Sequence, residues 1–273
     1  MNNNNSTDHP ALDVYLWNHR VGRLWIDEKR RFVFQYDAEW IDRKDAVPLS
    51  LHLPLRAEIY PDDLSRPFFS NLLPEAEIKR IIARQLQISV NNDFAMLNRI
   101  GGECAGAVSV LPEGIAPAAK PGYQEQSEEE LHKIITDLPR RPLMAGVEGM
   151  RLSLAGAQNK LPVYMKGNHI FIASGNAPST HILKPPIRDL ENTVENETFC
   201  MMLAQKMALS VPQVTIHRGL DQLFIIERYD RKYDKDGAVL RIHQEDFCQA
   251  LGFLPDQKYE SEGGPSLKHC FTL

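Results

Sequence analysis

The stretch that decides the fold runs Arg151-Leu-Ser-Leu-Ala-Gly-Ala-Gln-Asn-Lys160, and a second short run, Thr180-His-Ile-Leu-Lys184, follows it. The first run holds small residues between two strand-like segments. Small residues let backbone amides approach a ligand closely, and successive N–H groups can cradle phosphate oxygens. An ordinary tight turn is the other interpretation, because the run contains only one glycine. The segment therefore predicts a loop between strands and makes it a candidate for binding phosphate.

The second run reads as a short strand that ends in Lys184. A lysine on the strand after a small-residue loop can reach the phosphates of a bound nucleotide, although a solvated lysine on an edge strand is the alternative. Thirteen residues further on, Glu197 lies near the start of an apolar helix. A helix carboxylate in that place can orient the lysine through an ion pair. Glu195 competes for this role, and we prefer Glu197.

Two more strand-like runs follow, Gln213 to His217 and Leu223 to Glu227, and the second continues into the polar segment Glu227-Arg-Tyr-Asp-Arg231. Protein kinases place their hinge where a buried strand runs into a polar segment, and the hinge backbone reads adenine. The order of loop, lysine strand, helix and hinge strand is more specific than any one part. It predicts a nucleotide-binding lobe.

The first hundred residues have a different pattern. Hydrophobic and polar residues alternate in three runs, which predicts three antiparallel strands at Leu12–Trp17, Arg20–Trp25 and Phe32–Tyr36. Helical spacing predicts amphipathic helices at Ala76–Leu86 and Asp93–Ile100, and a closing strand is expected at Ala105–Val110. A stretch rich in Pro, Gly and Ala at 112–127 has the composition of a linker. Ser127 then caps a predicted helix that continues to Leu138.

Composition excludes several classes of protein. The 273 residues are 43% hydrophobic and 25% charged, as in an ordinary globular protein, and a net charge of -5 offers no general attraction to DNA or anionic lipid. No apolar run is long enough to cross a bilayer, so we expect a cytoplasmic protein without a membrane partner. The four cysteines are far apart and form no C-x-x-C pair, which argues against a disulfide framework or a zinc site. We expect reduced, mostly buried thiols.

With these parts in view, the sequence resembles the HipA toxins, bacterial Ser/Thr protein kinases of type II toxin–antitoxin systems. The matching segments cover nearly the whole chain; they are 68–75 (Phe-Phe-Ser-Asn-Leu-Leu-Pro-Glu), 101–107, 153–160, 180–184, 196–197, 227–231, 243–250 and 258–265. The resemblance implies an α+β chain with a β-rich N-terminal subdomain followed by a protein-kinase-like nucleotide-binding lobe. The expected divisions are a disordered tail at 1–10, the subdomain at 11–112, a linker at 113–127, the lobe with phosphate loop and hinge at 128–231, and the start of a helical lobe at 232–273.

The resemblance also implies the site residues. Ser153 is similar to the autophosphorylated loop serine of the family, which we expect in a mobile loop, Lys184 to its ATP-binding lysine, and Glu227 to Tyr229 to its adenine-reading hinge. Glu197 supports the lysine. The residues expected to hold ATP are Ala155, Gly156, Ala157, Gln158, Lys160, Lys184, Glu227, Tyr229 and Asp230. Implied partners are a HipB-like antitoxin with a DNA-binding helix-turn-helix, which makes DNA contact indirect, and a translation-factor substrate such as glutamyl-tRNA synthetase. A role in bacterial persistence is also implied.

The family pattern fails near the end of the chain. Intact relatives carry a catalytic aspartate and a second aspartate that holds Mg²⁺, and no segment after Gly263 matches either. Asp246-Phe-Cys imitates a magnesium-binding triplet, but its surroundings have helical spacing. We therefore expect a C-terminally truncated chain that is catalytically inactive, with no catalytic residue and no metal site. The alternatives are a non-catalytic remnant that captures antitoxin, nucleotide or substrate, and an unrelated small-ligand enzyme whose loop is only a turn.

Overall fold

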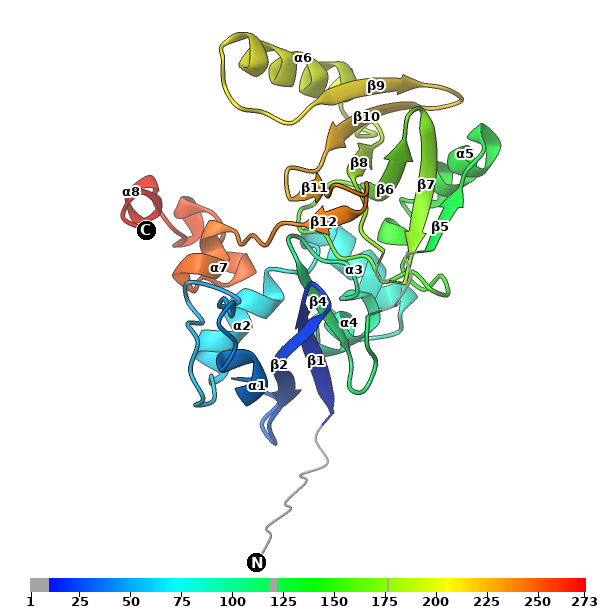
Figure 1. Cartoon of the computed structure of the whole chain (residues 1–273). Coiled ribbons are helices and arrows are strands. Elements are labelled where there is room, and N and C mark those ends of the chain that lie inside the picture. Colours follow the sequence, from blue (N-terminus) through cyan, green and yellow to red (C-terminus); the bar gives the residue numbers. More distant parts are fainter. Residues whose placement is uncertain (1–9, 118–121, 176) are drawn as a thin grey trace, which may run out of the picture.

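The computed structural model describes residues 10–117, 122–175 and 177–273, and it shows a mixed α/β chain (Figure 1). All but Pro10 of the expected N-terminal tail lies outside these residues. The first sheet has the antiparallel strand order β3-β2-β1-β4. Its strands are β1 (Ala11–Leu16), β2 (His19–Ile26), β3 (Phe32–Tyr36) and β4 (Val108–Pro112). The three predicted N-terminal strands are confirmed.

The closing strand begins three residues later than expected. Gly106 has a φ of +68° in the left-handed region, and its N–H donates a 2.7 Å hydrogen bond to Asp230. The backbone at 105–107 therefore turns toward the second half of the chain, and pairing with β1 starts at Val108.

Four helices cover the first sheet: α1 (Ala38–Ile41), α2 (Asp62–Ser70), α3 (Ala76–Gln85) and α4 (Asp93–Ile100). Aromatic and aliphatic side chains from strands and helices form one buried cluster, which includes Phe34, Phe69 and Leu97. Both predicted helices are confirmed. Helix α2 was not predicted, and Pro67 within it disguises the helical pattern.

The second sheet has the strand order β5-β7-β6-β8-β10-β9. Its strands are β5 (Gly122–Glu125), β6 (Leu161–Lys166), β7 (His169–Ser174), β8 (His181–Lys184), β9 (Val214–Arg218) and β10 (Gln222–Glu227). Helix α5 (Glu128–Asp137) starts at the predicted Ser127 cap, packs Leu131 and Ile135 against this sheet, and is followed by the short turn η1 (Pro142–Met144). Helix α6 (Thr193–Lys206) packs beside β9 and β10 at the top of Figure 1.

The predicted linker is partly an edge strand. Residues 122–125 pair with β7, and the Tyr123 ring lies 4.3 Å from the Tyr164 ring. This cross-strand aromatic contact stabilises pairing that a composition rich in Pro and Gly conceals. Residues 118–121 of the expected linker lie outside the described residues.

Residues after the hinge begin with a hairpin of β11 (Arg231–Tyr233) and β12 (Val239–Arg241), where a helical segment was expected. The turn is closed by Asp234, whose carboxylate accepts hydrogen bonds from the N–H groups of Asp236 and Ala238. Short helical elements follow at α7 (Phe247–Leu251), η2 (Pro255–Gln257), η3 (Glu260–Glu262) and α8 (Leu267–Phe271), which confirms helical structure near 246–251 and 267–273.

Helix α7 packs on α2 of the N-terminal subdomain, as Figure 1 shows. The Gln249 side chain donates to the Phe68 carbonyl oxygen at 3.0 Å, and Asn71 donates to that of Phe253 at 2.8 Å. The C-terminal segment therefore rests on the first half of the chain. In the described part of the chain, no helix is long and apolar enough to cross a membrane.

The four cysteines are free thiols. Cys104 and Cys248 are buried, Cys200 is exposed and Cys270 is intermediate, so the expectation of mostly buried thiols holds for two of them.

Candidate functional site

The centre of the site is an ion pair between a strand and a helix. Lys184 is the last residue of β8, and its Nζ lies 2.7 Å from Oε2 of Glu197 on α6. Both side chains are about one quarter exposed, so a ligand can reach the ammonium while the carboxylate holds it in place. The competing carboxylate, Glu195, instead accepts a hydrogen bond from Gln222. The structure therefore contains the predicted ion pair between Lys184 and Glu197.

The small-residue loop supplies a second lysine. Gly156 has a φ of +107°, which side-chain-bearing residues rarely adopt, and Lys160 donates a hydrogen bond back to the Ala155 carbonyl oxygen. Burial, and then repulsion from Lys184, lowers the pKa of the Lys160 ammonium to about 8. Ala157 and Gln158 lie between these residues in the same loop. The structure thus brings two lysines and a loop with a left-handed glycine to one place.

Ser153 is buried. Its side chain is 0% exposed, and its hydroxyl donates to the Leu72 carbonyl oxygen at 2.6 Å. The backbone on either side is also held, because Glu103 N–H donates to the Arg151 carbonyl and Ser153 N–H donates to that of Glu103. Burial and these hydrogen bonds hold the serine in place in the structure, and the expected mobility of its loop stays a prediction.

The predicted hinge follows β10 directly. Backbone N–H groups of Glu227 and Arg228 donate to the carbonyls of Gln213 and Thr180, so both are already used within the fold. Tyr229 is 69% exposed, and its hydroxyl hydrogen bonds to the Gln244 side chain. The next residue, Asp230, is 3% exposed.

Asp230 belongs to a buried ionic network, which we call the hinge network; its members are Glu103, Ser179, Arg228, Asp230 and Arg231. Asp230 accepts from Arg228 at 2.8 Å, Arg231 lies 2.9 Å away, and the Gly106 amide is a third donor. Glu103 accepts from Arg231 and from Ser179. These contacts occupy the Asp230 carboxylate, so its position is set by the fold.

Charge compensation keeps the hinge network ionised. Burial opposes the charged form of Glu103, but Arg228 and Arg231 outweigh it, so the pKa of this carboxyl lies below its ordinary value. The Asp230 pKa is also lowered: burial raises it, and hydrogen bonding and attraction from Arg228 more than reverse that effect. Because Glu103 comes from the first half and the other members from the second, the network joins the two halves beneath the hinge.

A cavity of about 310 Å³, which we call the hinge cavity, lies between the hinge, Lys160 and the C-terminal segment. Of the predicted site residues, Gly156, Ala157, Gln158 and Lys184 are not among those that line it. Three parts of the chain line it: Asn71, Leu72 and Ala105 from the N-terminal subdomain; Leu154, Ala155, Lys160, Ile182 and 226–230 from the lobe; and Gln244, Glu245, Asp246 and Gln249 from the C-terminal segment. Its walls are apolar near Ile182 and Ile226 and cationic at Lys160. That combination suits a ligand with a flat apolar part and a charged part.

The carboxylates near this cavity are engaged in structural contacts. Asp246 caps α7 by accepting from the Gln249 N–H at 2.8 Å, and Glu245 accepts from the Leu51 N–H at 2.9 Å. Across residues 10–117, 122–175 and 177–273, no three His, Cys, Asp or Glu side chains gather in a group that could hold a metal ion.

A further pair of charges closes the side of the site near the C-terminal segment. Lys258 Nζ lies 2.7 Å from Oε1 of Glu75, and both groups influence the Lys160 pKa. Sequence reasoning missed this pair and the hinge network, because their members are far apart in the chain. The one local signal was a charged residue, Glu103, inside the small and apolar run 101–107.

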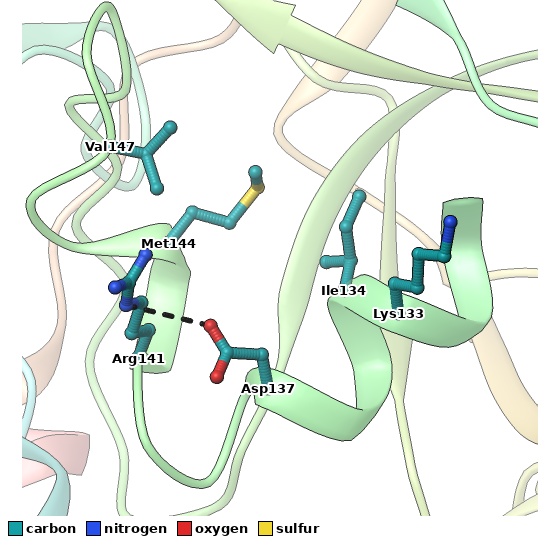
Figure 2. Close-up of a pocket in the computed structure, with 6 residues that line it drawn as sticks. All are labelled: Lys133, Ile134, Asp137, Arg141, Met144 and Val147. Atoms are coloured by element: carbon teal, nitrogen blue, oxygen red, sulfur yellow. Dashed lines mark ion pairs between the residues drawn. The ribbon is translucent and has the colours of Figure 1, made fainter.

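Another hollow lies between α5 and η1, and neither Lys160 nor Lys184 lines it. Figure 2 shows Asp137 reaching toward Arg141, with Ile134 and Met144 lining the space. The two charged groups are 3.6 Å apart and neutralise each other. The hollow contains no residue expected to bind a ligand, so the hinge cavity is the better candidate.

Two protein-family models match this chain, one in its N-terminal part and one in its C-terminal part. Residues 12–111 match the HipA N-terminal domain and residues 152–273 match the HipA-like C-terminal domain. The chain belongs to the HipA family.

Individual HipA-family relatives agree. The chain is 45% identical over 270 residues to "Putative kinase Y4mE" of Sinorhizobium fredii, covering 96% of this chain and 64% of that protein. It is 33% identical over 257 residues to the serine/threonine-protein kinase toxin HipA of Shewanella oneidensis, covering 93% of this chain and 58% of the toxin.

A solved structure has the same fold. The HipA, HipB and operator DNA complex of Shewanella oneidensis contains a chain that matches with a TM-score of 0.77 and 32% identity, over 94% of this chain and 60% of that one. The present chain therefore spans about three fifths of the length of these HipA-family proteins.

Proposed function

We propose that this chain binds ATP in the hinge cavity, as the nucleotide-binding part of a HipA-type serine/threonine-protein kinase. The observation that carries the proposal is the Lys184–Glu197 ion pair beside the small-residue loop. A fixed ammonium with a second lysine, Lys160, nearby supplies the positive charge that a triphosphate requires. Ala155, Gly156, Ala157 and Gln158 would present backbone amides to the same phosphates.

Adenine would lie against the hinge. The N–H groups of Glu227 and Arg228 are bonded within the fold, which leaves the Tyr229 amide as the available hinge donor and the Glu227 carbonyl as its neighbouring acceptor. Apolar side chains of Ile182 and Ile226 would cover the ring faces. Asp230 would contribute by fixing the hinge through Arg228 and not by direct contact.

We further propose that the 273 residues by themselves bind nucleotide without transferring phosphate. Transfer needs an aspartate for the hydroxyl nucleophile and another for Mg²⁺. Asp246 caps α7 through Oδ1, and Glu245 accepts from a backbone amide through Oε1, so each carboxylate is held in a structural contact through one oxygen, which favours neither for these tasks. Mg²⁺, where an intact kinase holds it, would neutralise the charge that develops on the phosphates.

Partners follow from the family and belong to the proposal. The Shewanella neighbour was solved with HipB and operator DNA, which supports a HipB-like antitoxin as partner and DNA contact through that antitoxin. A net charge of -5 agrees with indirect DNA contact. A translation factor such as glutamyl-tRNA synthetase is the proposed substrate of the intact kinase, in the cytoplasm.

One experiment separates the candidate functions. ATP affinity is measured by calorimetry for the wild type, Lys184→Ala and the control Lys166→Ala, whose lysine lies at the exposed end of β6. Transfer of labelled γ-phosphate, to the chain itself or to glutamyl-tRNA synthetase, is measured in parallel with Mg²⁺ present.

We expect ATP affinity to fall at least about tenfold, or about 1.4 kcal/mol, in Lys184→Ala and to stay unchanged in Lys166→Ala. If no phosphate is transferred either, the result supports a chain that binds nucleotide but lacks catalysis. Transfer above the Lys184→Ala level would refute the inactivity. If the wild type does not bind ATP at all, the result would favour an unrelated small-ligand enzyme in which the small-residue loop is an ordinary turn.

A further inference from the structure

Helix α6 exposes a stripe of large apolar side chains. Its inner face packs beside β9 and β10, and the side chains that it buries there are the smaller ones of Val194 and Thr198. The larger apolar side chains project from the opposite face; they are Phe199 (64% exposed), Met202 (53%), Leu203 (47%) and Met207 (67%). We call these four residues the α6 stripe. Figure 1 shows α6 at the outer margin of the molecule.

This arrangement reverses the usual one, because a surface helix normally turns its polar side to solvent. Single exposed apolar residues are common and need no explanation. The members of the α6 stripe, however, recur at intervals of three and four residues, so they lie next to one another along one face of the helix. A continuous apolar surface of this kind typically marks an interface.

Each end of the α6 stripe carries one charge, and the two charges are opposite. Glu195 lies one turn before Phe199, in the first turn of the helix, and Lys206 lies one turn after Met202, in the last turn. Both charged side chains are exposed, and Lys206 forms no ion pair with any residue that the structure describes. Positions 195, 199, 202 and 206 follow the four-three-four spacing of a coiled-coil seam.

A second copy of the same helix, running in the opposite direction, would complement this seam. Glu195 would face Lys206 of the second copy, and Phe199 would face Met202 of the second copy. Both pairs are centred on the same point of the helix, between residues 200 and 201, so one two-fold axis produces all of these contacts. A parallel copy would instead place like charges opposite each other at both ends.

A membrane surface fits the α6 stripe less well. Helices that lie on bilayers carry lysines and arginines along their polar face. The charged residues of α6 are two acids and a single lysine, and Asp189 and Glu191 lie just before the helix. This charge pattern opposes contact with anionic lipid and favours a polypeptide partner.

We infer that the chain forms a symmetric dimer in which the α6 stripes of two copies pack antiparallel. The Lys184–Glu197 ion pair is not part of the seam, because Glu197 lies on the inner side of α6, where it contacts the last residue of β8. The inference therefore does not depend on nucleotide binding. Because the seam is only a few helical turns long, we expect a reversible dimer with a dissociation constant in the micromolar range.

The test is sedimentation equilibrium of the whole 273-residue chain at about 1 to 300 µM, a range that covers micromolar dissociation constants. We expect a monomer–dimer equilibrium for the wild type and at least tenfold weaker association for Met202→Ser. Ile115→Ser is the matched control, because Ile115 lies outside α6 and is 54% exposed, close to the 53% of Met202. It should associate as the wild type does.

Charge variants test the direction of the two helices. Glu195→Lys and Lys206→Glu each place like charges opposite each other in an antiparallel dimer, so each variant alone should associate at least tenfold more weakly than the wild type. An equal mixture of the two variants restores opposite charges in the mixed dimer and should associate about as tightly as the wild type. Circular dichroism checks that each variant keeps its helices.

Three results would overturn the inference. A wild-type chain that stays monomeric over the whole concentration range would leave the α6 stripe to a different polypeptide. Dimers that Met202→Ser and Ile115→Ser weaken equally would form through another surface. Charge variants that each associate as tightly as the wild type would exclude the antiparallel arrangement. The wild-type measurement decides the first point even if a variant does not fold.

Discussion

The Ser153 hydroxyl donates to the Leu72 carbonyl oxygen at 2.6 Å, and the two residues come from different halves of the chain. This hydrogen bond ties the candidate phosphate loop to the turn between α2 and α3. Phosphate added to Ser153 has no room in that position, because the side chain is fully buried. Modification of Ser153 therefore requires the loop to leave its present place.

We predict that Ser153→Ala lowers the free energy of unfolding by about 1 kcal/mol, the usual contribution of one hydrogen bond. Ser153→Asp should destabilise the chain more, because it buries a charge without a partner, and should weaken ATP binding. Thermal unfolding and calorimetry measure the two effects. Equal stability and ATP affinity for wild type and Ser153→Asp would show that the loop is not held by this contact.

Glu197 and Glu195 form a matched pair for testing the site. Glu197→Gln removes the charge that holds Lys184 in place, so we expect ATP affinity to fall about threefold to tenfold, or about 0.7 to 1.4 kcal/mol. Glu195→Gln should have little effect, because this residue bonds to Gln222. Calorimetric titration of both variants gives the comparison. The assignment fails if the two variants bind ATP equally well.

Lys160 predicts a pH dependence. Its pKa is lowered to about 8, so the ammonium is present at pH 7 and is lost as the pH rises to 9. ATP affinity should therefore decrease across this range, and Lys160→Met should remove the decrease. Wild-type binding that does not change between pH 7 and pH 9 would contradict the prediction.

The lowered pKa of Lys160 also determines how the free energy of unfolding changes with pH. In the unfolded chain Lys160 keeps its proton up to its ordinary pKa, so between that value and about 8 the unfolded state binds more protons than the folded state. The free energy of unfolding due to this group should then rise with pH in that interval. Urea unfolding of wild type and Lys160→Met, compared at pH 7 and pH 9.5, measures it.

Gly156→Ala should impair the loop in two ways. A Cβ at this position would lie 2.6 Å from Lys160 Nζ, and the φ of +107° disfavours any side chain. We expect at least a tenfold loss of ATP affinity. Gly167→Ala is the control, since it also places alanine at a positive φ but meets no atom within 4 Å. Equal ATP affinity for the two variants would separate the loop from nucleotide binding.

The hinge network should be important for stability. Arg228→Met leaves Asp230 and Glu103 buried with one cation fewer, and breaking a buried ion pair typically costs about 3 to 5 kcal/mol. Arg218→Met, at an exposed end of β9, should change the free energy of unfolding by less than about 0.5 kcal/mol. Urea unfolding measures both variants. A small effect of Arg228→Met would mean that solvent reaches the network.

Patterns of adjacent residues in the sequence were sufficient to predict much of the fold. The alternation in β1 to β3, the Ser127 cap of α5 and the lysine at the end of β8 are each recorded in a few adjacent residues, and each was predicted. Pairing of Lys184 with Glu197 could also be anticipated, because strand and helix are close in sequence and kinase lobes share their order.

Features that depend on distant contacts could not be predicted in this way. Ser153 is buried by Leu72, and Asp230 is occupied by Arg228 and Gly106, although both residues look available in the sequence. Strand β5 has the composition of a linker and is ordered only by pairing with β7. Affinity of the predicted site residues for ATP stays a prediction, as does the expected truncation.

The hinge network also bears on how the protein can be dissected. A fragment that begins at residue 128 would retain Arg228 and Arg231 but lose Glu103, and would expose their guanidinium groups where the N-terminal subdomain now covers them. Such a lobe, expressed alone for crystallisation or inhibitor screening, would have an altered hinge. Pieces of this chain intended for study should therefore keep residues 101–107 together with 226–231.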